Sequence, residues 1–390
     1  GRRQPRCGAR REGRLVNMNR RRQILIASAA ALALPASHAQ ALHRPGDALQ
    51  PRALRFPRDH GTHNETRTEW WYLTGHASDA QGRAFGFQVT FFRSRVDGTQ
   101  GLRSPLAARQ LLFAHAAITD VQGGRLLHDQ RIARWNGEPP AQTARSVFAS
   151  AEDTHVVLRD WSLQRTPDGR YTTRVTGDEL GIDLTAVPQQ AWLLQGDQGF
   201  SRKGPDPAQA SFYVSQPHLT VQGTLALRGQ RFEVRGTAWL DHEWSEEVLH
   251  PQAVGWDWIG MNLFDGHSLT AFRLRRKDGS ALWAGGSFRA AGSAQDANDI
   301  YRFRPGEVEF KPQRLWTSPL TRASYPVEWM IRTPADFYTV KAVVDAQELD
   351  SRQSTGTVYW EGLSDLFDSN GRHVGRGYLE MTGYAQRLVL

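Results

Sequence analysis

The sequence has almost no cysteine: Cys7 is the only one among 390 residues. It lies ahead of Met18, where we expect translation to begin, so the mature chain would contain no cysteine. A mature chain without cysteine excludes a disulfide framework, a cysteine-based metal site and a thiol nucleophile. A chain of this length can nevertheless bury enough apolar surface to fold without disulfides.

The sequence also lacks an apolar run that approaches the ~20 residues needed to span a membrane. The apolar segment from Ile24 to Leu34 is shorter, follows arginines at positions 20–22, and precedes small residues. This order is typical of an export signal, with cleavage after Ala39 or Ala41. We therefore expect residues 1–41 to be upstream sequence plus a signal peptide. The mature protein would be periplasmic, without stable membrane insertion.

The pair Arg21-Arg22, followed by Gln23, Ile24 and Leu25, fits a twin-arginine signal, which exports proteins that have already folded. The general secretory route, with additional arginines in the signal, is the alternative. The cleavage point carries no lipobox cysteine, so a soluble periplasmic protein is favoured over a lipoprotein.

Beyond the signal, the chain lacks a surplus of either charge. The formal net charge is +8, and residues 1–41 alone supply it through nine arginines and the single acid Glu12. The remaining residues therefore sum to zero. Net charge gives no electrostatic reason to expect DNA or RNA binding, and we predict no nucleic-acid partner.

Long segments with the 3.6-residue period of an amphipathic helix are missing as well, which predicts few and short helices. The chain instead alternates between apolar and other residues, as at Phe87, Val89 and Phe91. Pairs such as Asp97-Gly98 divide it into short segments. Short alternating strands joined by tight turns are typical of an all-β sandwich or barrel.

A weak internal repeat divides the chain. Segments 69–76 and 84–93, and again 255–263 and 269–275, give a tryptophan-rich strand, a turn and an alternating strand. We therefore predict an all-β protein of two barrel-like domains in tandem. Lipocalin-type barrels carry a tryptophan near the start of the first strand that closes one end, and Trp70 and Trp256 are the candidates. The predicted boundaries are a leader at 42–58 and domains at 59–248 and 249–390.

Two hydrolase motifs are absent. The sequence contains no G-x-S-x-G nucleophile elbow. His242-Glu243 is not followed by the second histidine of an H-E-x-x-H zinc helix. Because consecutive strand residues point to opposite faces, Asp241, His242 and Glu243 cannot chelate one ion together. We expect no metal ion and no cofactor.

Residues 237–260 form the most informative segment, because acids and a histidine lie there among tryptophans. Burial beside large apolar rings is where pKa values shift most. On a strand, His242 and Trp244 share one face, and Asp241 and Glu243 share the other. This pattern favours the mouth of a ligand site. The alternative is a barrel rim whose polar groups are satisfied by ordinary hydrogen bonds.

Long motifs follow one another in order along residues 55–387. They include E-W-W-Y-L-T-G-H (69–76), F-A-H-A-A-I-T-D (113–120), G-T-A-W-L-D-H-E-W-S (236–245), G-W-D-W-I-G (255–260) and G-R-G-Y-L-E-M-T-G-Y (375–384). Together they resemble the AttH/CrtC family of secreted "predicted hydrolases", which is related to carotenoid 1,2-hydratase (hydroxyneurosporene synthase). The resemblance implies a double lipocalin-like (calycin) architecture. It also implies an ABC transporter permease as a candidate partner.

The resemblance also implies an activity. In the carotenoid hydratases, an inward His-x-Trp pair and a following Tyr/Asp pair are implicated in protonating an isolated double bond and adding water. His242 and Trp244 match the first pair. Where the second is expected, residues 269–273 read L-T-A-F-R, so Asp241 or Asp257 would have to supply the acid. The candidate catalytic residues are thus His242, Trp244, Asp241 and Asp257.

Further polar and aromatic residues are candidate ligand contacts. Each has a structural alternative: His115 as a buried hydrogen-bonded histidine, Lys203 as an exposed loop cation, and Glu69 as a domain-interface residue. Lys203 and Arg93 could also neutralise the acids across that interface. The candidate ligand-binding residues are Tyr213, Glu243, Trp239, Trp258, His115, Lys203 and Glu69.

Two functions remain open at this point. One is a periplasmic protein that binds a hydrophobic lipid or isoprenoid, in association with an ABC transporter. The other is a carotenoid 1,2-hydratase-like hydro-lyase. We expect His242 to face an aromatic-lined cavity at the junction of the two barrels. A tunnel that ends at His242 beside an acid would favour the enzyme, and an open cleft without a convergent acid would favour binding.

Overall fold

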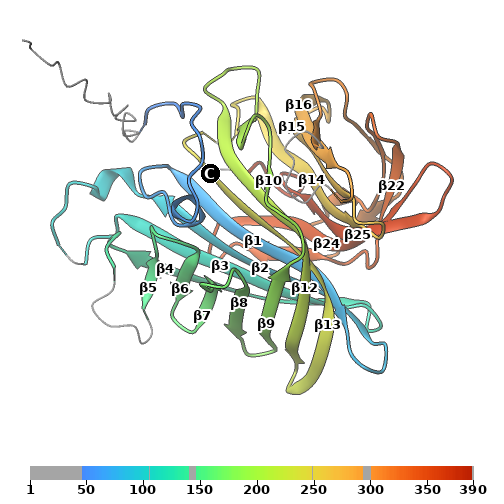
Figure 1. Ribbon diagram of the computed structural model, residues 1–390, viewed down its shortest axis with the longest axis horizontal. Helices are drawn as coiled ribbons and strands as arrows, with labels where there is room; N and C mark the ends of the chain where they lie inside the picture. The colour runs from blue at the N-terminus through green and yellow to red at the C-terminus, as the bar shows by residue number, and fades with distance from the viewer. Residues whose placement is uncertain (1–45, 105, 140–145, 248, 293–299, 389–390) are drawn as a thin grey trace, which may run out of the picture. The chain divides into compact units, whose positions relative to one another are not determined.

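The N-terminal half of the chain folds into a sheet of thirteen antiparallel strands (Figure 1). The computed structural model describes residues 46–388 apart from 105, 140–145, 248 and 293–299. The strands of this N-terminal sheet are β1 (Thr68–Ser78), β2 (Ala84–Arg95), β3 (Gln110–Asp120), β4 (Arg125–Trp135), β5 (Val147–Ala149), β6 (His155–Leu158), β7 (Trp161–Arg165), β8 (Tyr171–Thr176), β9 (Leu180–Pro188), β10 (Leu193–Leu194), β11 (Phe200–Arg202), β12 (Ala210–Leu227) and β13 (Gln230–Ser245).

These strands form a nearly closed barrel. Their order is β4-β3-β2-β1-β13-β12-β9-β8-β7-β6-β5, and the short β10 and β11 both pair with β12. The long strands β1, β2, β3, β12 and β13 therefore lie side by side and present one continuous outer face. That face forms one wall of the site described below.

The C-terminal half forms a second sheet of ten strands. A separate two-stranded sheet is formed by residues 315–326, within the same half of the chain. The order in the C-terminal sheet is β17-β16-β15-β14-β25-β24-β22-β21-β18, with β23 paired to β24. The strands are β14 (Ala253–Leu263), β15 (Ser268–Arg276), β16 (Ala281–Arg289), β17 (Ile300–Arg302), β18 (Glu309–Pro312), β21 (Glu328–Arg332), β22 (Phe337–Ala342), β23 (Glu348–Ser351), β24 (Thr357–Phe367) and β25 (His373–Met381); the small sheet is β19 (Leu315–Thr317) and β20 (Ser324–Pro326).

The prediction of an all-β protein with few helices is confirmed, because strands make up 58% and helices 2% of the structure. The helical segments within the described residues are the 3₁₀ turns η1 (Arg58–His60) and η2 (Asp97–Thr99). No helix in this part of the chain has the length and apolarity that crossing a membrane requires. The predicted signal peptide and residues 42–45 lie outside the described residues.

The two sheets share a topology that matches the sequence repeat. In the N-terminal sheet β1 lies between β2 and the last strand β13, and in the C-terminal sheet β14 lies between β15 and the last strand β25. The change of sheet falls between Ser245 and Ala253. Residues 43–390 nevertheless pack as a single compact unit.

Three clusters of buried apolar residues explain this packing. One fills the N-terminal sheet and a second fills the C-terminal sheet. The third joins Tyr72 and Trp239 of the N-terminal sheet to Trp258, Phe272 and Tyr378 of the C-terminal sheet. Burying each such aromatic side chain contributes about 1.5–3 kcal/mol, so the outer faces of the two sheets are held together by a substantial apolar interface.

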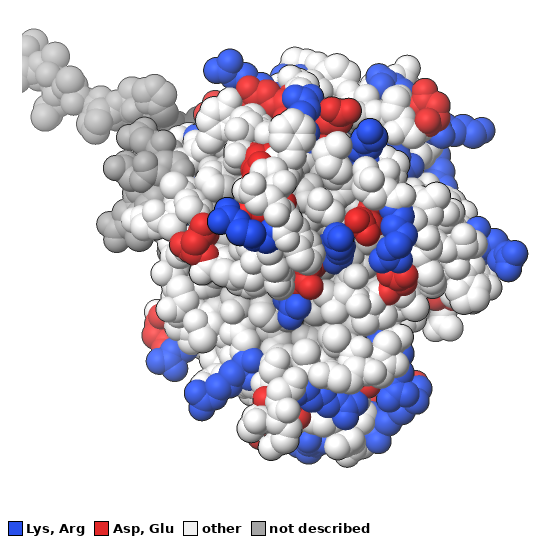
Figure 2. Space-filling model, turned by 90° about the vertical axis from the view of Figure 1, so that its right-hand side faces the viewer, with Lys and Arg blue, Asp and Glu red and all other residues white. Residues whose placement is uncertain are grey.

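The described part of the leader packs against the N-terminal sheet. Leu49 and Leu54 contact the cluster around Phe212 and Trp244. On the surface shown in Figure 2, basic and acidic side chains lie among one another, as expected for a chain whose charges balance after residue 41.

Candidate functional site

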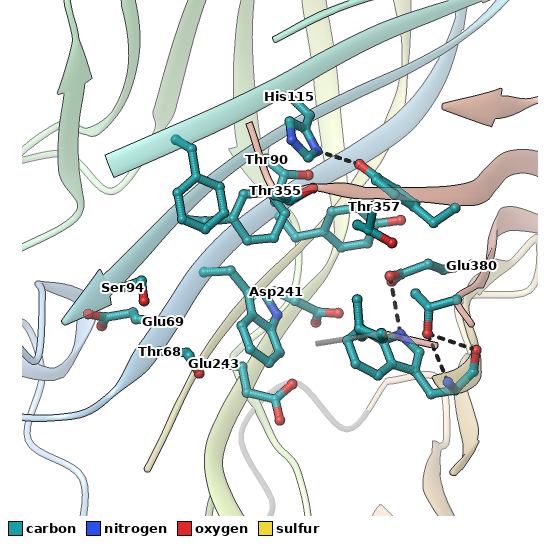
Figure 3. Close-up of a pocket in the computed structure, with 18 of the residues that line it drawn as sticks. Thr68, Glu69, Thr90, Ser94, His115, Asp241, Glu243, Thr355, Thr357 and Glu380 are labelled. Atoms are coloured by element: carbon teal, nitrogen blue, oxygen red, sulfur yellow. Dashed lines mark hydrogen bonds between the residues drawn. The ribbon is translucent and has the colours of Figure 1, made fainter. Parts of the chain in front are cut away.

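A cavity of about 290 Å³ lies where the outer faces of the two sheets meet (Figure 3). Its lining comes from β1, β2, β3, β12 and β13 on one side and from β14, β15, β24 and β25 on the other. The size approaches the lower end of the range for small-molecule sites, and aromatic side chains with a few polar groups are the usual lining of such sites.

The N-terminal wall consists of two cross-strand rows. Because residues directly opposite each other on neighbouring strands share a face, the register places whole rows against the cavity. The row nearer the strand ends is Tyr213, Glu243, Trp70, Phe92 and Phe113, and the next is Ser215, Asp241, Tyr72, Thr90 and His115.

The C-terminal wall is a third row. Trp258 of β14 lies opposite Phe272 of β15 and opposite Glu380 of β25. Glu380 in turn lies opposite Glu361 of β24. Figure 3 shows Glu380 on one side of the cavity and Asp241 and Glu243 on the other. Several carboxyl groups therefore face one largely aromatic space.

Asp241 is held by three donors. Tyr213 Oη donates to Oδ2 at 2.8 Å, and Ser215 Oγ and Trp239 Nε1 donate to Oδ1 at 2.5 and 2.7 Å. Burial raises the pKa of Asp241 to about 7, and the three donors oppose this rise because they stabilise the ionised form. Asp241 therefore titrates near neutral pH.

Glu380 and Glu361 form a pair of buried acids on the opposite wall. Burial raises the pKa of Glu380 to about 8, although Trp256 Nε1 donates to Oε1 at 3.1 Å. Burial and then the neighbouring Glu380 raise the pKa of Glu361 well above its usual range. Within the described residues, Glu361 Oε1 and the Tyr72 hydroxyl have no hydrogen bond of ordinary geometry. The pair is thus largely protonated at pH 7 and offers polar atoms to a ligand.

The sequence interpretation missed both of these acids. Glu361 follows Tyr359 and Trp360, and Glu380 follows Tyr378 and Leu379. A carboxylate directly after large apolar residues of a strand was the available signal, because burying an unpaired acid is costly and calls for a reason.

Glu243 is neutralised by Lys203. The Lys203 ammonium lies 2.9 Å from Glu243 Oε1 and above the rings of Tyr213 and Phe272, at 4.6 and 4.4 Å from their centroids. Lys203 is buried, so the alternative of an exposed loop cation is wrong. The contact instead fits the other structural alternative, in which Lys203 neutralises an acid of this site.

His242 and Trp244 lie on the opposite face of β13 from Asp241 and Glu243. His242 is opposite Trp71 and stacks on it at 4.8 Å, and its Nε2 donates to Glu69 Oε1 at 2.8 Å. Burial lowers the pKa of His242, so the ring is neutral. We expected His242 to face the cavity, but it does not line it. The cavity lies on the outer face of the sheet, and strand alternation turns His242 inward.

Glu69 borders the cavity, yet its carboxylate lies at the centre of a buried ion cluster. Besides the bond from His242, it accepts bonds from His63 Nδ1 at 2.8 Å and Arg93 Nε at 2.9 Å. His63 Nε2 bonds Asp59 at 3.0 Å. Burial alone would raise the pKa of Glu69, but the charge of His63 and these donors hold it well below its usual range.

His63 carries both ring protons, because each of its nitrogens faces an ionised carboxylate. Burial alone would lower its pKa, but Glu69 and Asp59 raise it. Ligand atoms of His63, Glu69 and His242 lie within 4.8 Å of one another, close enough to hold a metal ion. A metal ion would have to displace the proton on His63 Nδ1 and compete with Arg93 for the Glu69 carboxylate. The geometry therefore fits a network of hydrogen-bonded ion pairs better than a metal-coordination site.

Asp257 also lies outside the cavity lining. It follows Trp256 and precedes Trp258, which both line the cavity, so alternation turns its side chain to the other face of β14. There it accepts bonds from Arg273 Nε at 2.7 Å and Tyr384 Oη at 2.8 Å. The structure therefore does not bring this predicted acid together with Asp241.

His115 lines the cavity and also matches the alternative of a buried hydrogen-bonded histidine. Burial lowers its pKa to about 3, so it is neutral. Since burial keeps Tyr359 protonated, the Tyr359 hydroxyl donates to Nδ1 at 2.6 Å, and Nε2 donates to Ser354 Oγ at 2.8 Å. His115 thereby ties β3 to β24 and fixes Tyr359 beside Glu361.

Trp70 and Trp256 do not plug the ends of the barrels, as the lipocalin pattern predicted. Both are half-buried and line the cavity. Trp71, one residue further on, has the fully buried position inside the N-terminal sheet. The pattern identified the correct strands but the wrong face of each.

We expect His242→Ala to lower stability by about 1–3 kcal/mol, because Glu69 loses one buried donor, and to leave ligand affinity unchanged. Melting temperature and ligand titration measure the two effects. Asp241→Asn, on the adjacent residue and opposite face, is the matched variant and should weaken ligand binding or turnover. Loss of affinity in His242→Ala at an unchanged melting temperature would contradict the placement of His242 behind the cavity wall.

Two barrel-like sheets that meet at an aromatic cavity with buried acids define the architecture of this β-protein. The model of the AttH-like family matches residues 47–384, so the chain belongs to this family and the predicted resemblance is confirmed. A search of curated proteins gives no match.

Two solved structures share the fold. A crystal structure assigned as an AttH from Nitrosomonas europaea is 44% identical, has a TM-score of 0.77, and covers 86% of this chain and 99% of its own. Kievitone hydratase from Nectria haematococca is 13% identical, has a TM-score of 0.63, and covers 86% of this chain and 94% of its own. At that identity the second likeness shows the fold alone.

Proposed function

We propose that this protein binds a hydrophobic small molecule of the lipid or isoprenoid class in the cavity and adds water to one of its C=C bonds. One observation carries the proposal: carboxylic acids kept neutral by burial face aromatic rings in the same enclosed space. A neutral acid in an apolar site can deliver a proton that water-exposed carboxylates have already lost.

The reaction divides between the two walls of the cavity. The protonated Glu361–Glu380 pair gives a proton to one alkene carbon, so the π bond breaks, a C–H bond forms and a cation develops on the other carbon. Water then forms a C–O bond with that carbon and loses a proton to a carboxylate. The sum is alkene plus water giving an alcohol, and the turnover closes when the carboxylate that received the proton passes it through water back to the Glu361–Glu380 pair.

Asp241 is suited to be the carboxylate that accepts the proton from water. Its three donors stabilise the ionised form, whereas Glu361 has an unpartnered oxygen. Two acids whose surroundings favour different protonation states are the usual arrangement for paired acid and base roles. The faces of Trp70, Trp258 and Tyr72, which line the same cavity, would stabilise the intermediate cation.

The fold is one that also occurs in a hydratase. Kievitone hydratase has the same architecture, and its name describes addition of water. Sequence resemblance points to the carotenoid hydratases, but their His-x-Trp element corresponds here to His242 and Trp244, which line the inner face of the sheet. The proposal therefore rests on the acids of the cavity and not on that element.

Binding alone is the second candidate function, and the aromatic lining favours it. We expect an acyclic isoprenoid alkene to quench tryptophan emission and to raise the melting temperature. Trp70, Trp256 and Trp258 line the cavity, and a ligand at 100 times its Kd stabilises the folded state by about 2.7 kcal/mol.

If lipids and isoprenoids change neither tryptophan emission nor the melting temperature, both functions are rejected. Binding without an alcohol product by mass spectrometry would reject the hydratase and leave the binding protein.

We also propose that the protein is exported to the periplasm and works beside an ABC transporter permease; the pattern of residues 18–41 and the family resemblance support this. Arg21→Lys combined with Arg22→Lys should block export through the twin-arginine route, as fractionation and N-terminal sequencing would measure. Unchanged export would favour the general secretory route. Cys7 retained in the secreted protein would contradict the signal peptide itself.

A further inference from the structure

A second hollow, of about 860 Å³, lies on the C-terminal sheet and shares no lining residue with the cavity. It is lined by two aromatic side chains, Trp329 and Tyr384, and by four basic side chains. The basic side chains are Arg273 and Arg275, which are buried, and Lys277 and Arg387, which are exposed. We call this hollow the basic cleft.

The charges of the basic cleft do not balance. Among its described lining residues, Asp278 is the only acid. Asp257 lies beneath it, at 2.7 Å from Arg273 Nε and at 3.5 Å from Arg275 Nε. Two carboxylates thus face four cations, which leaves a surplus of two positive charges. One surplus charge belongs to the two buried arginines, which share Asp257, and the other belongs to the exposed residues of the cleft. A buried cation is stable when it is paired and hydrogen-bonded, so the cleft favours an anion.

Arg275 shows where that anion would bind. Its Nη2 donates to Thr382 O at 2.6 Å, and its guanidinium lies 3.9 Å from the ring centroid of Tyr384. Its Nε lies 3.5 Å from Asp257 Oδ2 and makes no hydrogen bond of ordinary geometry among the described residues, although the side chain is only 8% exposed. Leaving a buried charged donor unsatisfied is costly, and an anionic oxygen would satisfy it.

We propose that the basic cleft binds a phosphate group, either free or as the headgroup of an amphiphile. A phosphate monoester carries roughly −1.5 to −2 charges near neutral pH, which matches the surplus. Arginine guanidinium groups bind phosphate oxygens with directed, charge-assisted hydrogen bonds. Tyr384, which is half-buried and lines the cleft, lies beside whatever the phosphate is attached to. This site goes beyond the proposed function, because it does not depend on any residue of the cavity.

Calorimetric titration with inorganic phosphate, and co-sedimentation with vesicles containing phosphatidic acid, test the proposal. The double variant Lys277→Gln with Arg387→Gln changes only exposed residues and should weaken binding by about tenfold or more, a loss of about 1.4 kcal/mol. Arg275→Gln should weaken it further. Arg235→Gln, an exposed cation on β13 outside the cleft, is the matched control and should bind as the unmodified protein does.

Each outcome decides the proposal. Phosphate binding lost in the cleft variants supports a free-phosphate site, and vesicle binding lost in the same variants supports a headgroup site. Binding that Arg235→Gln weakens equally is non-specific attraction and overturns the site. Absence of binding to both probes in the unmodified protein also overturns it. Because Arg275→Gln alters a buried group, the melting temperature of this variant must be measured. If Arg275→Gln does not fold, the double variant alone tests the proposal.

Discussion

Replacing Glu361 by glutamine should lower the rate of water addition by about 100-fold to 10 000-fold, the usual contribution of a general acid. Glutamine keeps the shape of the side chain but has no acidic proton. Ligand binding should persist, because the aromatic lining is unchanged. The measurement is alcohol formation from an acyclic isoprenoid alkene alongside fluorescence titration of the same variant.

Glu380→Gln is the partner experiment. Glu361 and Glu380 lie directly opposite each other, and the charge of Glu380 raises the pKa of Glu361. Removing Glu380 lowers the pKa of Glu361, and removing Glu361 takes away an acid of the pair, so both variants should lose activity and neither should equal the unmodified protein. Glu309→Gln removes an exposed carboxylate on the same sheet and should keep full activity. If Glu361→Gln and Glu380→Gln both retain full turnover, the acid lies elsewhere and the mechanism is wrong.

The pH profile gives an independent check on the same acids. The proton donor must be protonated, so the rate should fall as pH rises through the raised pKa of the pair, about 8 for Glu380. The base must be ionised, so the rate should fall as pH drops below about 7, the pKa of Asp241. Together these give a bell-shaped profile with a narrow optimum. In Asp241→Asn the acidic limb should disappear along with most of the rate.

Alternation and turn residues were enough to predict the fold. Phe87, Val89 and Phe91 alternate in β2 as expected, and the internal repeat corresponds to two sheets with the same strand order at their centres. Local sequence also predicted that Asp241 and His242 would point to opposite faces, because strand geometry fixes this whatever the rest of the molecule does.

The face that borders the cavity could not be predicted from sequence. Both faces of β1 and of the second half of β13, from Ala238 to Ser245, are largely buried, since one lines the interior of the N-terminal sheet and the other meets the C-terminal sheet. Their patterns therefore give no contrast between an inner and an outer face. His242 was assigned to the cavity because it lies among tryptophans. Docking of the C-terminal sheet against the other face of β13 places Asp241 at the cavity instead.

The partners of Glu69 were missed for a related reason. Asp59 and His63 come from the segment that follows the leader, where the sequence R-D-H-G-T-H has no strand pattern. Their role depends on folding back against β1 and β13, which no local rule predicts. The sequence places Glu69 directly ahead of Trp70 and Trp71, but no residue near it in the sequence indicates which groups neutralise its charge.

Glu69→Gln should therefore lower the free energy of unfolding by about 3–5 kcal/mol, the usual effect of removing one partner from a buried ion pair. Arg93 and the protonated His63 would remain buried without the carboxylate that compensates them. Chemical denaturation measures the change. Glu179→Gln, which breaks an exposed pair with Arg228, is the matched control and should cost about 1 kcal/mol or less.

If Glu69→Gln does not fold, Thr62→Val provides a milder test. Thr62 Oγ1 donates to Glu69 Oε2 at 2.8 Å, and losing that bond should lower stability by about 1 kcal/mol. A change in Glu69→Gln as small as that of the surface control would show that the cluster contributes little and that its charges are compensated in another way.

The pH dependence of this difference identifies its source. The folded pKa of Glu69 is lowered, so its contribution is present above its ordinary value of 4.5 and is lost as pH falls through the lowered value. The folded pKa of His63 is raised, so its contribution is full below its ordinary value of 6.5 and is lost as pH rises through the raised value. The stability gap between the unmodified protein and Glu69→Gln should therefore be widest between about pH 4.5 and 6.5 and narrow on both sides. A gap that stays constant with pH would mean that Glu69 acts through packing and not through charge.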